Sequence, residues 1–337
     1  MPHVGIDRTR PRSRLAPSPT GPLHVGNAAT FLVNWALARN LGWELVLRIE
    51  DLDAERTRAA GEVGIEEDLH WLGIDHDGPA ERQSQRMPAY VDAMQRLAAQ
   101  GLVYRSPLSR AEVREATRAL GAPHADDGHR PFPAALRPPH GADWAFADPA
   151  SNHRLRTDPG EEVSDDRVAG EHRIDPSRTE GDCIVWTKAG VPAYQLAVTV
   201  DDAMQGVTDV VRGDDLLPSA AIQARVHRAL GGAPPTWWHQ PLVMDHSGAR
   251  LAKRHGGRSL RGLREAGADP GRLRGLVRWW ITGEREARPC TAAEFRHAID
   301  APILREWHRR SRTAPPTLCE RALGWLEGCA PAPARPS

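Results

Sequence analysis

Residues 14–27 carry groups that suit phosphate binding. They read Arg-Leu-Ala-Pro-Ser-Pro-Thr-Gly-Pro-Leu-His-Val-Gly-Asn and join a short apolar strand end to a long apolar-patterned segment. A constrained turn that delivers backbone N–H groups to the start of a helix is a ready phosphate site. His24 adds a side-chain donor, and Gly26 lets a nucleotide approach the backbone closely. The stretch therefore predicts an ATP site at the start of a helix.

Two other groups of residues complete this chemistry. Glu50-Asp51-Leu52-Asp53 follows the apolar run 44–49, which is typical of a buried parallel strand. Active groups of open α/β sheets lie at the carboxyl ends of such strands. Lys253 belongs to a Gly-rich basic loop, residues 245–257. A cation on such a loop can close on the charge that builds on phosphates as pyrophosphate leaves.

Helices and strands must position these groups, and hydrophobic periodicity predicts them. The pattern predicts an α/β chain with a parallel sheet that an irregular insertion interrupts. Helices are expected at 27–41, around 65–72, and at 88–100, 109–120, 218–230, 260–266 and 270–280. Strands are expected to end at residue 16 and to span 44–49, 183–186, 193–200 and 241–244. The paired tryptophans 237–238 and 279–280 are expected in the core or at interfaces.

Composition limits the remaining possibilities. Lys plus Arg (44) equals Asp plus Glu (44), so a polyanion would have to meet a local basic patch rather than a global charge. The four cysteines form no CxxC pair, which indicates a reducing compartment without a disulfide framework. Residues 1–13 look like a flexible basic leader rather than a secretory signal. No stretch approaches the ~20 apolar residues of a membrane span. We expect a cytoplasmic monomer.

Five ordered motifs resemble the catalytic region of class I aminoacyl-tRNA synthetases, in the form used by glutamyl enzymes. The resemblance covers roughly residues 12–280. Its motifs are residues 14–27, Arg48-Ile49-Glu50-Asp51-Leu52-Asp53, Gln83-Ser84-Gln85-Arg86, the segment from Ala193-Tyr194-Gln195-Leu196-Ala197 through Asp201-Asp202 to Val211-Arg212-Gly213-Asp214-Asp215, and Arg250-Leu251-Ala252-Lys253-Arg254. The resemblance implies a Rossmann-like catalytic domain followed by a small helical region similar to a stem-contact domain.

The resemblance also implies roles for individual residues. Guanidinium groups pair bidentately with carboxylates, which suits a glutamate substrate. The implied glutamate-binding residues are Arg14, Ala16, Ser18, Glu50 (for the ammonium group), Tyr194 and Arg212. The implied ATP-binding residues are Pro17, Thr20, His24, Gly26, Asn27 and Lys253, among which His24, Asn27 and Lys253 are catalytic. ATP with Mg²⁺ is the implied nucleotide.

Length narrows the resemblance to one branch. Only about eighty residues follow Lys253, whereas full glutamyl-tRNA synthetases continue into a large anticodon-binding region. The chain therefore resembles the truncated branch that activates glutamate without tRNA and esterifies queuosine in the anticodon stem-loop of tRNA(Asp). Two alternatives stay open: a compact glutamyl-tRNA synthetase that charges a 3′ end, and a catalytically silent nucleotide- or RNA-binding paralogue. The Arg-dense run 250–278 fits either tRNA phosphates or a solvated helix face.

Two departures from the branch's pattern have consequences. Arg250 and Ala252 replace the usual Lys and Ser of the second signature loop, so we expect activation to be retained but slower. The branch often holds zinc in its insertion, but the matching positions here are Ser106, Leu108, Phe132 and Leu136. None of these is a soft zinc ligand, so we predict no zinc there and a subdomain held by packing.

The expected organisation follows these motifs. It comprises a leader (1–13), the first half of the catalytic domain (14–105), an insertion (106–180), the second catalytic half with the Lys253 loop (181–257), a helical region (258–308) and a tail without regular structure (309–337).

Overall fold

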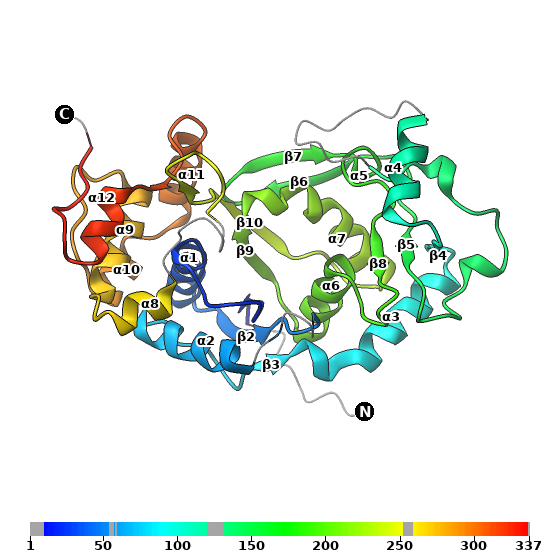
Figure 1. Ribbon diagram of the computed structural model, residues 1–337, viewed down its shortest axis with the longest axis horizontal. Coiled ribbons are helices and arrows are strands. Elements are labelled where there is room, and N and C mark those ends of the chain that lie inside the picture. The colour runs from blue at the N-terminus through cyan, green and yellow to red at the C-terminus, as the bar shows by residue number, and fades with distance from the viewer. Residues whose placement is uncertain (1–9, 54–56, 58, 120–130, 252–258, 336–337) are drawn as a thin grey trace.

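The computed structural model describes residues 10–53, 57, 59–119, 131–251 and 259–335. Three parts follow one another along the long axis of the molecule (Figure 1). The C-terminal helices lie at one end, parallel strands lie in the centre, and the insertion lies at the other end. No helix within these described ranges is long and apolar enough to cross a membrane.

The central strands form two parallel pieces that meet side by side. One piece has the order β1-β2-β3 and the other pairs β9 with β10. They meet where the Thr208 amide donates to the Arg12 carbonyl at 2.9 Å. The strands are β1 (Arg12–Leu15), β2 (Glu44–Ile49), β3 (Glu81–Arg82), β9 (Asp209–Gly213) and β10 (Thr236–Gln240). The parallel α/β arrangement expected from the sequence is confirmed.

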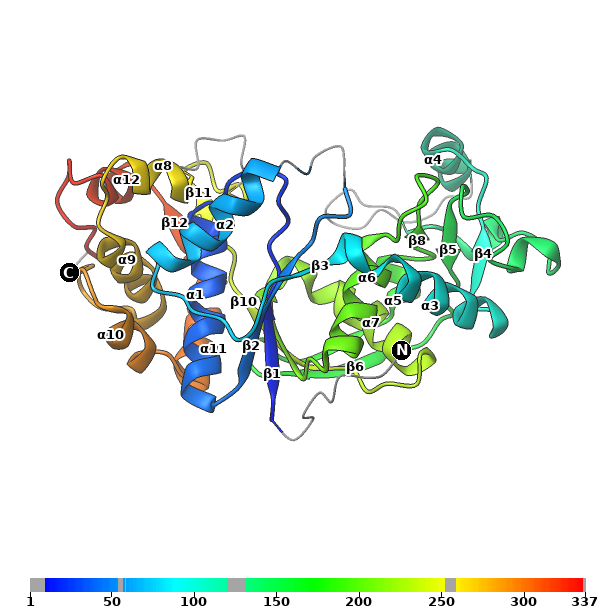
Figure 2. The same ribbon diagram turned by 90° about the horizontal axis from the view of Figure 1, so that it is seen from below.

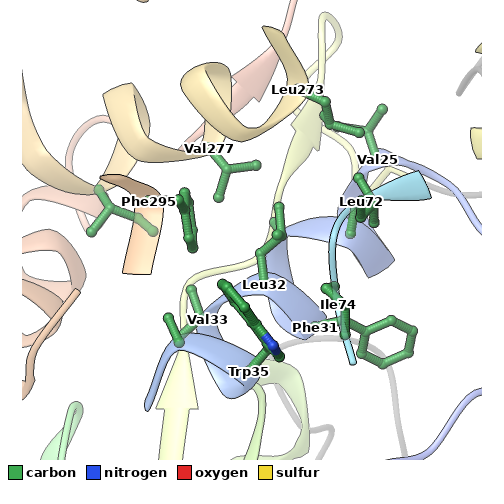
Figure 3. Packing of buried hydrophobic residues seen from close by; sticks show 14 of the residues in the cluster. Val25, Phe31, Leu32, Val33, Trp35, Leu72, Ile74, Leu273, Val277 and Phe295 are labelled. Atoms are coloured by element: carbon green, nitrogen blue, oxygen red, sulfur yellow. The ribbon is translucent and has the colours of Figure 1, made fainter. Parts of the chain in front are cut away.

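Helix α1 (Val25–Leu41) follows β1 through the turn at residues 16–24 and is almost surrounded by apolar side chains. It ends at Gly42, whose positive φ of 70° is a conformation that glycine adopts without strain. Figure 3 shows Phe31, Leu32 and Val33 of this helix among side chains from neighbouring elements. Because α1 is held from several sides, its first turn is a fixed platform for the cavity described below.

Most of the expected helices are present, but one expected strand is a helix. Residues 193–200 were expected to be extended, whereas α6 spans Tyr194–Gln205. Leu196, Ala197 and Val200 share the buried face of this helix, so tertiary packing outweighs the β propensity of its branched residues. The other helices between the strands are α2 (Ala59–Trp71), the 3₁₀ turn η1 (Gln83–Arg86), α3 (Met87–Ala99), the 3₁₀ turn η4 (Asp214–Leu216) and α7 (Leu217–Ala229).

The strands after α6 also differ from expectation. No strand was expected at β9, and the strand expected at 241–244 is replaced by β10 and by the short β11 (Met244–Asp245). Trp237 and Trp238 lie on β10 and are buried, as expected. Both faces of β10 are buried, so the strand lacks the alternation of apolar and polar residues that marks a half-buried strand.

The insertion is built around two small antiparallel sheets, and its first sheet extends beyond the expected boundaries. This sheet contains β4 and β8, which had been assigned to the neighbouring halves of the catalytic domain. The hairpin of β6 and β7 lies beside β10. The insertion's elements and flanking strands are β4 (Val103–Arg105), α4 (Arg110–Ala119), η2 (Ala134–Leu136), η3 (Ala142–Trp144), β5 (His153–Leu155), β6 (Glu162–Asp166), β7 (Gly170–Ile174), α5 (Pro176–Thr179) and β8 (Ile184–Trp186).

The positions that match zinc ligands in related insertions carry packed side chains here. Phe132 belongs to a buried cluster with Tyr104 and Trp144, and Leu108 and Leu136 pack against that cluster. Ser106 is buried, and its hydroxyl accepts a 3.1 Å hydrogen bond from Arg154, whose guanidinium also stacks on the Phe132 ring. The absence of zinc stays a prediction, with this cluster as its support.

The expected tail is folded as far as Arg335, so that expectation was wrong. Leu318, Ala322, Trp325 and Leu326 are buried and join the same core as α1. Ala322, Trp325 and Leu326 lie on the buried face of a short helix, which the terminal Pro- and Ala-rich residues had obscured. The C-terminal elements, seen together at one end in Figure 2, are α8 (Leu260–Glu265), α9 (Pro270–Thr282), α10 (Ala292–His297), α11 (Ala301–Ser311), β12 (Thr317–Leu318) and α12 (Glu320–Leu326).

Arginines of the basic run largely hold this C-terminal part together. Arg264 pairs with Glu67 at 2.6 Å, and Arg274 donates to the Leu72 carbonyl at 3.1 Å, both across to α2 and its end. Arg272 donates to the Trp325 carbonyl at 2.8 Å. These guanidiniums therefore have partners within the protein.

Candidate active site

One cavity gathers the site residues that the sequence predicted. It has a volume of about 370 Å³ and lies at the carboxyl ends of β1, β2 and β9, beside the first turn of α1. The predicted residues that line it are Arg14, Ala16, Pro17, Ser18, Thr20, His24, Gly26, Asn27, Glu50, Tyr194 and Arg212. Lys253 and Ala252 lie outside the described residues.

Arg14 enters this cavity from a buried network of charges. Asp202 of α6 accepts from Arg48 at 2.6 Å and from Arg14 at 3.2 Å. Arg48 also donates to Glu50 at 3.3 Å and is itself fully buried. Burial would raise the pKa of Asp202, but the charges of Arg48 and Arg14 hold that pKa below its ordinary value. The network fixes Arg14 and Glu50 next to each other with opposite charges at the cavity wall.

Glu50 is the cavity's nearly buried carboxylate, with 11% of its side chain exposed. Burial raises the pKa of Glu50, and the guanidiniums of Arg48 and Arg14 oppose that rise. The Glu50 amide donates to the Pro17 carbonyl at 3.0 Å, so β2 and the turn after β1 are joined at this point. A carboxylate that loses water in this way is suited to a cationic partner such as an ammonium group.

Arg212 supplies a second guanidinium from β9. Its groups donate to Gln223 at 2.7 Å, to His239 at 3.0 Å and to the Leu216 carbonyl at 3.2 Å. Burial lowers the pKa of Arg212, and the neighbouring charge of Arg14 lowers it further. Two guanidiniums that face one cavity form a receptor for an anion with carboxylate groups.

His24 caps helix α1 at the cavity wall. Its Nδ1 accepts from the Gly26 amide at 3.1 Å, and the Asn27 side chain accepts from the His24 amide at 3.1 Å. In the neutral ring the proton is therefore on Nε2. The cap and Gly26 thus lie at the cavity wall and at the start of α1, and phosphate binding there stays a prediction.

The motif Gln83-Ser84-Gln85-Arg86 does not line this cavity but bonds to residues next to its wall. Gln83 donates to Asp201 at 2.7 Å, and Arg86 pairs with Asp201 at 2.9 Å. The Ser84 amide and hydroxyl both donate to Asp51, at 2.8 and 2.6 Å. The motif thus ties η1 to α6 and to the residues after β2.

Arg250, the departure from the usual Lys, also lines the cavity and pairs with Asp215. Asp215 ends the motif that contains Arg212, but the sequence assigned it no role. Sequence patterns assigned no role to Thr30 or Leu242 of the wall, nor to Asp202, Gln223 and His239 behind it. Asp201 and Asp202 belong to one of the motifs that resemble the synthetases. Two consecutive acidic residues in that motif were the sequence feature that could have indicated the buried charge network.

A larger cavity of about 1110 Å³ continues from the first one. The two share Ser18, Glu50 and Tyr194. The larger cavity runs between α4, the insertion sheet and α6, and its wall carries the cations Arg114, Arg154 and Lys188. Within the described ranges, no cluster of three or more His, Cys, Asp or Glu side chains is arranged to hold a metal ion.

Comparisons with known proteins agree with this geometry. Residues 11–311 match the family of tRNA synthetases class I (E and Q), catalytic domain. The chain is 40% identical over 275 residues to a glutamyl-Q tRNA(Asp) synthetase of Rhodobacter capsulatus, covering 79% of this chain and 99% of the relative. It is 42% identical over 269 residues to a protein of the same name from Symbiobacterium thermophilum, covering 76% and 82%.

Longer relatives match over their catalytic part. The chain is 39% identical over 279 residues to glutamate–tRNA ligase 2 of Brucella ovis, covering 81% of this chain but 58% of that protein. A crystal structure of a glutamate tRNA ligase from Elizabethkingia meningosepticum has the same fold, with a TM-score of 0.74 at 24% identity and coverage of 94% and 68%. The chain therefore belongs to the class I tRNA synthetases of the E and Q type, and it is a ligase of the aminoacyl-tRNA synthetase kind.

Proposed function

We propose that this chain activates L-glutamate with ATP in the absence of tRNA and transfers the glutamyl group to queuosine in the anticodon stem-loop of tRNA(Asp). The observation that supports glutamate activation is the charge pattern of the smaller cavity. Two buried guanidiniums, Arg14 and Arg212, and one nearly buried carboxylate, Glu50, match the two carboxylates and one ammonium of glutamate.

The position of ATP follows from the cap of α1. His24, Gly26 and Asn27 line the same cavity as the guanidiniums of Arg14 and Arg212. A substrate carboxylate oxygen attacks the α-phosphorus of ATP, supplied as its Mg²⁺ complex, and pyrophosphate leaves. His24 and the positive end of the α1 dipole stabilise charge on the α-phosphate. Lys253, with Arg250 at the base of its loop, stabilises the departing pyrophosphate.

The transfer step uses the larger cavity. A hydroxyl of the acceptor attacks the carbonyl carbon of glutamyl-adenylate, and AMP leaves. The larger cavity opens onto Glu50 and Tyr194, where the adenylate's amino acid part would lie, and it has room for a nucleoside. The names of the relatives that the chain covers to 99% and 82% of their length favour queuosine as the acceptor.

The transfer experiment separates this proposal from its alternative. The protein is incubated with ATP, Mg²⁺ and labelled L-glutamate, together with tRNA(Asp) that carries or lacks queuosine. The tRNA is then digested with nucleases. The proposal predicts label on the anticodon fragment of the queuosine-containing tRNA alone. Label on the 3′-terminal adenosine, of these tRNAs or of tRNA(Glu) supplied in a parallel reaction, would instead identify a compact glutamyl-tRNA synthetase. No label in any of the reactions would contradict both.

A further inference from the structure

Arg212 is oriented from behind by a neutral histidine. An arginine has five N–H donors, and it always donates. Because the Arg212 Nε–H donates to His239 Nε2 at 3.0 Å, that nitrogen must be an acceptor. The ring proton therefore sits on Nδ1, which donates to Asp166 Oδ2 at 2.6 Å. Asp166 thus determines which nitrogen of His239 faces Arg212.

The carboxylate is itself fixed by the backbone. Asp166 Oδ1 accepts from the amides of Val168 at 2.9 Å and Ala169 at 2.8 Å. The side chains of Asp166 and His239 are 1% and 0% exposed. Burial lowers the pKa of His239 to about 4, so the ring is neutral near pH 7. A protonated ring would place a second donor against Arg212.

We propose that Asp166 and His239 are positioning residues for the substrate-binding guanidinium of Arg212. Asp166 holds the His239 tautomer, and this tautomer holds Arg212 Nε in the orientation that presents its remaining N–H groups to the cavity. Asp166 comes from β6 of the insertion, so the insertion contributes to amino-acid recognition without touching the substrate. The inference rests on the proposed function, in which Arg212 binds a carboxylate of glutamate.

Asp166→Asn is the sharpest perturbation, because it keeps size and shape. The two backbone amides keep the Asn oxygen in the Oδ1 position, so the amide nitrogen takes the Oδ2 position and donates to His239 Nδ1. The ring proton must then move to Nε2, where it faces the Arg212 Nε–H. His239→Gln, in contrast, offers Arg212 an amide oxygen in place of Nε2 and has no tautomer to change.

We expect Asp166→Asn to raise KM for glutamate roughly tenfold to a hundredfold in ATP–pyrophosphate exchange, with KM for ATP within about twofold of the parent. His239→Gln should have a smaller effect. The double variant should resemble His239→Gln, which means that the second substitution rescues the first. Asp182→Asn is the matched control, since Asp182 is an equally buried carboxylate bonded to Tyr104 and Arg137. It should leave KM for glutamate unchanged.

Nitrogen NMR of the histidine side chains gives a readout that needs no activity. His239 should be Nδ1-protonated in the parent and Nε2-protonated in Asp166→Asn. An unchanged tautomer, or a double variant worse than Asp166→Asn, would overturn the inference. If the parent shows the expected tautomer but no glutamate-dependent exchange, the proposed function is wrong. The inference that Arg212 binds glutamate then fails with it, although the His239 tautomer is as expected. The two failures are therefore distinguishable.

Discussion

Gly26 offers a substitution that separates catalysis from stability. It is the second residue of α1, its amide donates to the His24 ring at 3.1 Å, and an added Cβ would lie 3.0 Å from two ring atoms. Gly26→Ala must therefore displace the imidazole that we place at the α-phosphate. Alanine favours the helix by up to about 1 kcal/mol. Weakening the cap costs about 1 kcal/mol. The net change in the free energy of unfolding is thus within about 1 kcal/mol of zero.

Activity should respond far more strongly. A catalytic group misplaced by about 1 Å can cost on the order of a hundredfold in rate. We expect kcat for glutamate-dependent ATP–pyrophosphate exchange to fall roughly tenfold to a hundredfold in Gly26→Ala, while the melting temperature stays within a few degrees of the parent.

Gly271 provides a matched control for Gly26→Ala. It is the second residue of α9, its amide donates to the capping Asp269 at 2.8 Å, and an added Cβ would lie 3.0 Å from the Asp269 carboxylate. Gly271→Ala disturbs a helix cap in the same way but away from the cavity, so exchange should be unchanged. Equal activity in the two variants would refute the role given to His24.

Further predictions concern charge and pH. Arg14→Lys and Arg212→Lys should each raise KM for glutamate about tenfold to a hundredfold, because lysine cannot pair bidentately; Arg39→Lys, at a surface pair, should not. Since burial raises the pKa of Glu50, KM for glutamate should rise on acidification from a higher pH than an ordinary carboxylate would give, and a flat profile would contradict this. His239 takes up its proton more readily when unfolded (pKa 6.5) than folded (about 4), so stability falls as pH falls. Between about pH 7.5 and 5, His239 should lower the free energy of unfolding by about 2 kcal/mol. Denaturant titrations of His239→Gln should therefore show a correspondingly smaller decrease in the free energy of unfolding over this pH range.

The sequence predicted the cavity wall well because its residues come from contiguous motifs at element ends. Arg14, His24 and Glu50 stand where a strand meets a turn or a helix, and this local pattern is readable without tertiary structure. The groups behind the wall were missed for a physical reason. Asp166 reaches His239 across 73 positions of sequence, from a hairpin with weak periodicity.

The secondary-structure predictions were wrong where burial on all sides removes the hydrophobic periodicity of a helix or strand. The branched residues of 193–200 favour a strand locally, yet Thr199 bonds back to the Gln195 carbonyl at 2.8 Å within α6. β10 is short and buried on both faces, so its sequence offers no regular alternation of apolar and polar residues. The C-terminal helix α12 has only seven residues, which is too short for composition to reveal.

The most direct test of the central claim is exchange of labelled pyrophosphate into ATP without tRNA. We expect exchange with L-glutamate and little or none with L-aspartate. The Arg14→Ala/Arg212→Ala double variant should lose exchange while keeping the melting temperature of the parent. Exchange that is absent from the parent, or that persists in the folded double variant, would contradict the claim that this cavity recognises and activates glutamate.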